Sequence, residues 1–220
     1  MKRLVIFDLD GTILNTIGGI GSACNEMLGQ YGFPTWQLDQ YEQFVGDGSR
    51  MLIKRALPGD KAADEDFVDA AKEVYLKFYR ANLARQTRPY PGMPQLLAQL
   101  QERGIKLAVA SNKFDDGAKY LVPHFYPQIS WAAVEGQKPG GPLKPEPGII
   151  GDAIAGSGCA DLPLDEILYV GDCDIDIHSA ERSGLDYVLC TWGFRRRAAL
   201  EAASAKALID TPAELLQYLD

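Results

Sequence analysis

Asp8 and Asp10 are the residues whose type and spacing point most directly to chemistry. They follow the apolar run Leu4–Phe7 and precede a glycine, Gly11. In an extended segment the side chains at i and i+2 point to the same side, so both carboxylates can converge on one cation. Gly11 lets the backbone turn sharply after them, and exposed amides near Thr12 could then face an anion. The pattern favours metal and phosphate chemistry, although a strand followed by an aspartate-rich turn has the same pattern.

Three further groups of polar residues lie farther along the chain. They are Ser111-Asn112-Lys113, Lys144-Pro145-Glu146-Pro147 and Gly171-Asp172-Cys173-Asp174-Ile175-Asp176. Taken alone, each is typical of a turn, a loop or a helix cap. In an open parallel sheet, however, ligands bind beyond the carboxyl ends of the strands, where such groups would meet. A serine hydroxyl and an asparagine amide there can bond a phosphoryl oxygen.

The elements that must position these groups are short apolar runs that alternate with helical stretches. The predicted strands are residues 3–7, 105–110, 129–134, 167–170 and 187–191, with 207–209 a weaker candidate. Most are almost continuously apolar, which is typical of strands covered on both faces. Leucines at helical spacing end a helix near Gly104, and Ile149 to Ala155 form another. The alternation predicts an α/β fold with a Rossmann-like open parallel sheet.

The long interval between the first two strands interrupts this alternation. Residues 16–88 contain no convincing strand, and Phe67, Tyr75 and Phe78 recur at helical spacing. The segment therefore predicts an inserted α-helical subdomain over 16–88, and the α/β core comprises 1–15 and 89–220.

Composition excludes several classes of partner. Of the 220 residues 46% are hydrophobic, and 30 acidic residues against 22 lysines and arginines give a net charge of −8. This charge disfavours nucleic acid and anionic membranes as partners. No apolar window approaches the roughly 20 residues of a membrane span, so we expect a cytoplasmic protein. The four cysteines form no C-x-x-C pair, which argues against zinc or a disulfide framework. The run Arg195-Arg196-Arg197 is interpreted as a solvated helix start.

The ordered motifs cover nearly the whole chain and resemble a known family. FDLDGT at 7–12, SNK at 111–113, KPEP at 144–147 and GDCDID at 171–176 resemble the four motifs of the haloacid dehalogenase-like hydrolase superfamily. PYPG at 89–92 and TWGF at 191–194 resemble its phosphoglycolate phosphatase-like branch, which has a helical cap. The resemblance implies that the inserted subdomain is this cap.

The resemblance implies separate roles for the two opening aspartates. Asp8 would attack phosphorus and form an aspartyl-phosphate. Asp10 would protonate the leaving alcohol and later deprotonate the attacking water. Mg²⁺ would be held by the Asp8 carboxylate, the backbone carbonyl of Asp10 and Asp172, together with water and a phosphate oxygen.

The other motifs would hold the phosphoryl group. Ser111 and Lys144 would bind its remaining oxygens, with Thr12 and Asn112 contributing nearby. Asp176 would support Lys144 or a metal-bound water.

The third motif has two candidate lysines, because Lys138-Pro139 precedes Lys144-Pro145. Lys144 is preferred since Pro145 and Pro147 together fit the family pattern.

Substrate choice should lie in the cap. Residues 45–50 resemble the cap segment that faces the active site, and Arg50 could bind a substrate carboxylate. An ordinary surface arginine at a helix start is the competing interpretation.

The function expected from the resemblance is a Mg²⁺-dependent phosphatase of a small phosphorylated metabolite, with 2-phosphoglycolate the first candidate, acting as a monomer or homodimer. A sugar-phosphate mutase of the β-phosphoglucomutase type and a non-catalytic relative stay open. A dehalogenase is disfavoured, because carbon–halogen cleavage does not need the acid that Asp10 provides.

Overall fold

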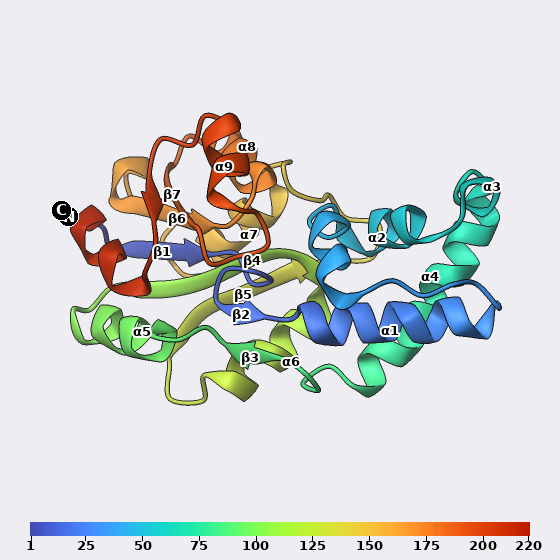
Figure 1. Ribbon diagram of the computed structural model, residues 1–220. Helices are drawn as coiled ribbons and strands as arrows, with labels where there is room; N and C mark the ends of the chain where they lie inside the picture. The colour runs from blue at the N-terminus through green and yellow to red at the C-terminus, as the bar shows by residue number, and fades with distance from the viewer.

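The computed structural model describes residues 1–220. Figure 1 shows two parts: a larger body built around a sheet, which carries both termini, and an elongated helical part. The termini lie at the end of the body away from the helical part, where the Lys2 amide donates to the Leu219 carbonyl.

The body contains a six-stranded sheet in which every pairing is parallel, in the order β5-β4-β1-β6-β7-β8. Its strands are β1 (Leu4–Phe7), β4 (Lys106–Phe114), β5 (Trp131–Gln137), β6 (Ile167–Gly171), β7 (Asp186–Cys190) and β8 (Leu208–Ile209). This confirms the predicted α/β fold with an open parallel sheet. Most boundaries differ by one to three residues, and the largest difference is that the second predicted strand continues to Phe114, with a shift of register against β5 after Ala110. Ser111 to Lys113 therefore lie within the irregular end of β4 and not in a turn after it.

Alternate residues of the buried strands enter two hydrophobic clusters, one on each face of the sheet. Val5 and Phe7 belong to the cluster on the side of α5 and α6, whereas Leu4 and Ile6 belong to the cluster on the side of α7, α8 and α9. The helices of the body are α5 (Met93–Glu102), α6 (Asp115–Phe125), α7 (Gly148–Gly156), α8 (Asp174–Arg182) and α9 (Arg197–Ala202), with short 3-10 turns η2 (Leu164–Glu166) and η3 (Pro212–Tyr218). Coverage on both faces explains why these strands are apolar throughout.

The helical part, here called the cap, lies between two short strands that pair antiparallel, β2 (Leu14–Asn15) and β3 (Arg88–Pro89). Its helices are α1 (Ile17–Gln30), η1 (Leu38–Gln43), α2 (Gly48–Ala56), α3 (Gly59–Ala62) and α4 (Glu65–Ala81). The cap has its own hydrophobic cluster, which Phe194 of the body also enters. Burial of Phe194 there helps to hold the cap against the body. None of the helices combines the length and apolar character needed to cross a bilayer.

Candidate active site

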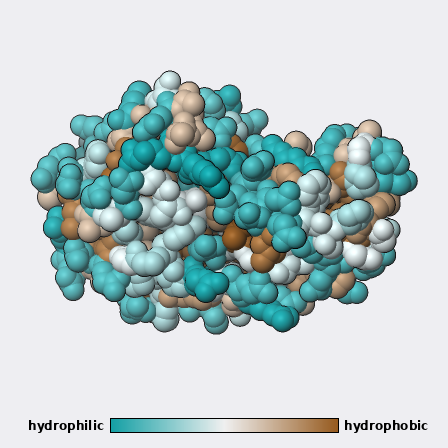
Figure 2. Space-filling view, in the orientation of Figure 1, coloured by the Kyte–Doolittle hydropathy of each residue, from teal (hydrophilic) through white to brown (hydrophobic).

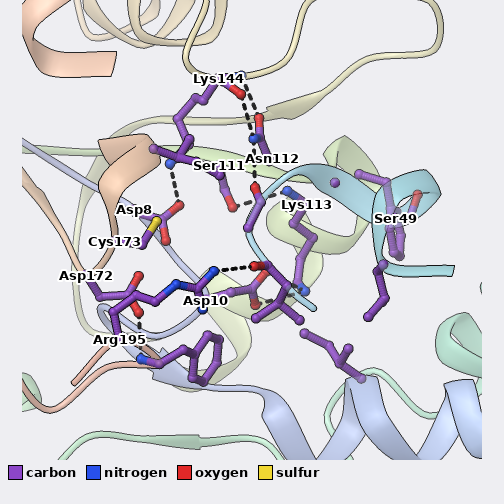
Figure 3. Close-up of a pocket in the computed structure, with 18 of the residues that line it drawn as sticks. Asp8, Asp10, Ser49, Ser111, Asn112, Lys113, Lys144, Asp172, Cys173 and Arg195 are labelled. Atoms are coloured by element: carbon purple, nitrogen blue, oxygen red, sulfur yellow. Dashed lines mark hydrogen bonds and ion pairs between the residues drawn. The ribbon is translucent and has the colours of Figure 1, made fainter. Parts of the chain in front are cut away.

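A pocket lies between the body and the cap, beyond the carboxyl ends of β1, β4 and β6. These three strands are neighbours in the sheet, and β1 is where the strand order reverses, the position at which open parallel sheets bind ligands. The cavity has a volume of about 70 Å³. Figure 2 shows hydrophobic residues where the two parts of the molecule meet. The polar lining residues are Asp8, Asp10, Ser49, Ser111, Asn112, Lys113, Lys144, Asp172, Cys173 and Arg195 (Figure 3).

Asp8 and Lys144 form the centre of the site. The Nζ of Lys144 donates to Oδ1 of Asp8 at 2.7 Å, to Oδ1 of Asp176 at 2.8 Å and to the hydroxyl of Tyr169 at 2.8 Å. Burial raises the pKa of Asp8 to about 7, and the ammonium of Lys144 opposes that rise. Although burial alone would lower the pKa of Lys144, the charges of Asp176 and Asp8 raise it well above its usual value. Lys144 is therefore a permanent cation beside Asp8.

Asp176 is fixed by donors on all sides. Its carboxylate accepts from Lys144 and Tyr169 through one oxygen and from the amides of Asp172 and Cys173 through the other. Burial opposes ionisation, yet these donors, Lys144 above all, lower the pKa of Asp176. A Cβ at position 171 would lie 2.2 Å from Cγ of Asp176, so the close contact between the backbone there and the Asp176 carboxylate requires glycine. Both oxygens of Asp176 are occupied, which suits it to positioning Lys144.

Asp172 is enclosed by glycines. A Cβ at Gly11, where φ is +93°, would lie 2.3 Å from Oδ2 of Asp172, and a Cβ at Gly193 would lie 2.5 Å from the same oxygen. The amide of Phe194 donates to that oxygen at 2.6 Å. The glycines of FDLDGT and TWGF are thus required so that backbone can approach one carboxylate.

The chemistry of the donor set fits Mg²⁺. Burial raises the pKa of Asp172 well above its usual range, and the charges of Asp176 and Asp8 add to this rise. A divalent cation would offset the cost of ionising two buried carboxylates. Mg²⁺ takes oxygen ligands and keeps several waters, so Asp8, Asp172 and the Asp10 carbonyl beside a pocket are suitable ligands.

Asp10 lines the pocket and is oriented from two directions. The hydroxyl of Thr16 donates to its Oδ1 at 2.6 Å, and the Nζ of Lys113 donates to its Oδ2 at 2.9 Å. Lys113 also donates to the hydroxyl of Tyr79 on α4 at 2.7 Å. Asp10 is therefore held at the junction of body and cap.

The residues predicted to bind phosphate have different positions. Ser111 is buried and lines the pocket, so its hydroxyl can meet a phosphoryl oxygen. The Asn112 amide donates to the carbonyls of Gly46 at 2.9 Å and Lys144 at 3.0 Å, which uses both of its N–H bonds. The side-chain amide of Asn112 therefore joins the third motif to the cap, while Asn112 still lines the pocket and its contact with phosphate stays a prediction. Thr12 is fully buried and is not among the residues that line the pocket, its amide donates to the Leu9 carbonyl, and its hydroxyl has no hydrogen-bond partner, so its contact with phosphate stays a prediction.

The two lysines considered for the third motif have different surroundings. Lys144 contacts Asp8, whereas Lys138 is half exposed and pairs with Asp152 and Glu135 on the surface. The geometry supports Lys144.

Arg50 does not line the pocket, which corrects its predicted role in substrate selection. Its Nη2 lies 2.5 Å from Glu65 and its Nε lies 2.8 Å from Asp69, both on α4. The side chain is 39% exposed. The turn that contains Arg50 does face the site, but through Gly48 and Ser49.

Two cations of the pocket were not assigned from the sequence. Lys113 belongs to the SNK motif. Its position at the end of an apolar strand is the sequence signal that could have identified it as a pocket residue. The sequence predicts a solvated helix start at Arg195, but α9 begins at Arg197. The guanidinium of Arg195 instead donates to the cap carbonyls of Glu42 and Val45.

Comparison with known proteins gives consistent matches. The model of the haloacid dehalogenase-like hydrolase family matches residues 5–190. Phosphoglycolate phosphatase of Aquifex aeolicus is 28% identical over 218 residues, which are 99% of this chain and 97% of that protein. The phosphoglycolate phosphatase of Cereibacter sphaeroides is 30% identical over 192 residues, which are 87% of this chain and 86% of that protein.

The structural comparison extends over both parts of the molecule. A crystal structure of a candidate phosphoglycolate phosphatase from Lactobacillus delbrueckii has a TM-score of 0.91 and 29% identity, and the match covers 100% of this chain and 99% of that one. The match includes the body and the cap, and it confirms the resemblance seen in the motifs.

Proposed function

Because the chain belongs to the haloacid dehalogenase-like hydrolases, we propose that it is a Mg²⁺-dependent phosphoric monoester hydrolase of a small phosphorylated metabolite, with 2-phosphoglycolate the first candidate. The observation that carries this proposal is the placement of Asp8, Asp10, Lys144 and Asp172 around one small cavity. A nucleophile, an acid, a fixed cation and a metal ligand are the parts that phosphoryl transfer through a carboxylate requires.

In this mechanism Asp8 attacks phosphorus and forms an aspartyl-phosphate, and the leaving alcohol takes a proton from Asp10. Asp10 then accepts a proton from the water that hydrolyses this intermediate. Ser111 holds a phosphoryl oxygen, and the Lys144 ammonium, whose three donors are bound within the body, stabilises the phosphoryl group through its charge and favours the ionised form of Asp8 against the effect of burial. Mg²⁺ bound by Asp8, Asp172 and the Asp10 carbonyl supplies charge neutralisation between an anionic nucleophile and an anionic substrate.

The lining of the pocket favours a phosphatase over a sugar-phosphate mutase. A mutase must hold a sugar with a second phosphate, and such groups need cations at both ends of the site. The cap contributes no lysine or arginine to the lining, and its residues there are Ile20, Val45, Gly46, Gly48, Ser49, Leu52, Tyr75 and Tyr79.

The test is phosphate release from 2-phosphoglycolate and from β-glucose 1-phosphate, with Mg²⁺ and with EDTA. We expect Mg²⁺-dependent release that is faster with 2-phosphoglycolate. Asp8→Asn should lower kcat by roughly six orders of magnitude, as loss of a covalent nucleophile does elsewhere. Asp152→Asn, on the surface beside Lys138, is the matched control and should retain activity. Full activity of Asp8→Asn would refute the mechanism, and formation of glucose 6-phosphate without net phosphate release would favour the mutase.

A further inference from the structure

The pocket contains three cations, and they differ in how many of their donors are used. All three donors of the Lys144 ammonium have acceptors within the body, in Asp8, Tyr169 and Asp176. Arg195 donates one N–H from each terminal nitrogen to a cap carbonyl, so these hydrogen bonds direct its guanidinium at the cap. Lys113 donates to Asp10 and Tyr79, which leaves one hydrogen of its ammonium for a ligand.

Lys113 is held firmly at the edge of the cavity. Its side chain is 2% exposed, and its Nζ lies 2.9 Å from the Asp10 carboxylate, 2.7 Å from the Tyr79 hydroxyl and 4.7 Å from the centre of the Tyr79 ring. The same cavity is lined by apolar groups of Ile20, Leu52 and Phe114. A charged ammonium beside such walls favours an anionic ligand, because an apolar group there would leave its free donor unsatisfied and a charge-assisted hydrogen bond is stronger than a neutral one.

We propose that Lys113 binds the carboxylate of the leaving group and thereby selects esters of 2-hydroxy acids. This inference rests on the proposed function, in which Asp10 lies beside the ester oxygen. In such an ester the carboxyl carbon is two bonds from that oxygen, so an ammonium in contact with Asp10 is within reach of the carboxylate. The free donor of Lys113 provides the contact, while its bonds to Asp10 and Tyr79 fix the direction of the ammonium.

The proposal is tested with two substrates that differ in the carboxylate, 2-phosphoglycolate and ethyl phosphate. Lys113→Met keeps the length of the side chain and removes its charge. Any effect on Asp10 itself should act on both substrates, whereas loss of a charge-assisted hydrogen bond acts on 2-phosphoglycolate alone. We expect kcat/KM for 2-phosphoglycolate to fall about 100-fold further than kcat/KM for ethyl phosphate. Lys138→Met, on the surface, should change neither value.

The outcomes separate this inference from the proposed function. Equal losses for both substrates would overturn the role of Lys113 in selection and leave the phosphatase intact. Binding to Asp8→Asn, measured by calorimetry, decides the matter even if no ester is hydrolysed. The inference is supported if Asp8→Asn binds 2-phosphoglycolate more tightly than ethyl phosphate and the Asp8→Asn, Lys113→Met double variant does not. It is rejected if Asp8→Asn shows no such preference, or if the double variant retains it. Lys113→Arg, which keeps the charge, should retain part of the preference, and circular dichroism would verify folding of each variant.

Discussion

The two sides of the pocket are assembled differently. On the body side, Lys144 and Asp176 are fixed by hydrogen bonds to residues of the same sheet and its following turns. On the cap side, Asn112, Lys113 and Arg195 extend from the body and donate to groups of the cap. Lys144 and Asp176 are therefore held within the body, whereas Asp10 and the groups that face the leaving group depend on contact between the two parts.

The largest effect is expected on the body side, from Asp172→Asn. The variant retains an acceptor for the Phe194 amide but loses the charge that makes Asp172 a metal ligand. We expect the Mg²⁺ concentration for half-maximal activity to rise by roughly 100-fold or more, because outer partners of metal sites alone contribute roughly 10- to 100-fold. Phosphate release measured against Mg²⁺ concentration gives this value.

The neighbouring Asp174→Asn is the control for that experiment. Asp174 is 56% exposed and its nearest cation, Arg195, is 3.9 Å away, so its loss should leave the Mg²⁺ dependence unchanged. Similar shifts in both variants would mean that the acidic turn acts only through its general negative charge.

A smaller effect is expected on the cap side, from Arg195→Ala. The variant removes the hydrogen bonds to the carbonyls of Glu42 and Val45, and the cap should close less often over the body. We expect KM to rise about 10-fold for 2-phosphoglycolate and ethyl phosphate alike, since closure is needed for both. Steady-state kinetics with the two substrates, together with hydrogen exchange of residues 42–46, would measure this.

Arg196→Ala is the matched control, because Arg196 is the adjacent arginine and is exposed. A loss in Arg195→Ala that concerns 2-phosphoglycolate alone would contradict closure and would give Arg195, rather than Lys113, the selective role.

The same contrast explains what the sequence could predict. Asp8 and Asp172 directly follow strands, Ser111 lies at the irregular end of one, and the carboxyl ends of parallel strands must meet, so local pattern was enough to place them together. The contacts of Asn112 and Arg50 could not be predicted, for a different reason. Their roles depend on which carbonyl or carboxylate of a distant segment lies nearby, and neither periodicity nor motif spacing contains that information.

Arg50→Ala should have the smallest effect on activity and stability of the variants proposed. It tests directly whether the cap or Lys113 of the body selects the substrate. The arginine lies in the cap, but its ion pairs with Glu65 and Asp69 are exposed, and exposed pairs contribute little to stability. We expect the melting temperature to fall by no more than about 3 °C. The ratio of kcat/KM for 2-phosphoglycolate to that for ethyl phosphate should stay at the wild-type value. A marked fall in this ratio would mean that the Arg50 side chain leaves its carboxylates for the substrate, and selection would then reside in the cap instead of in Lys113.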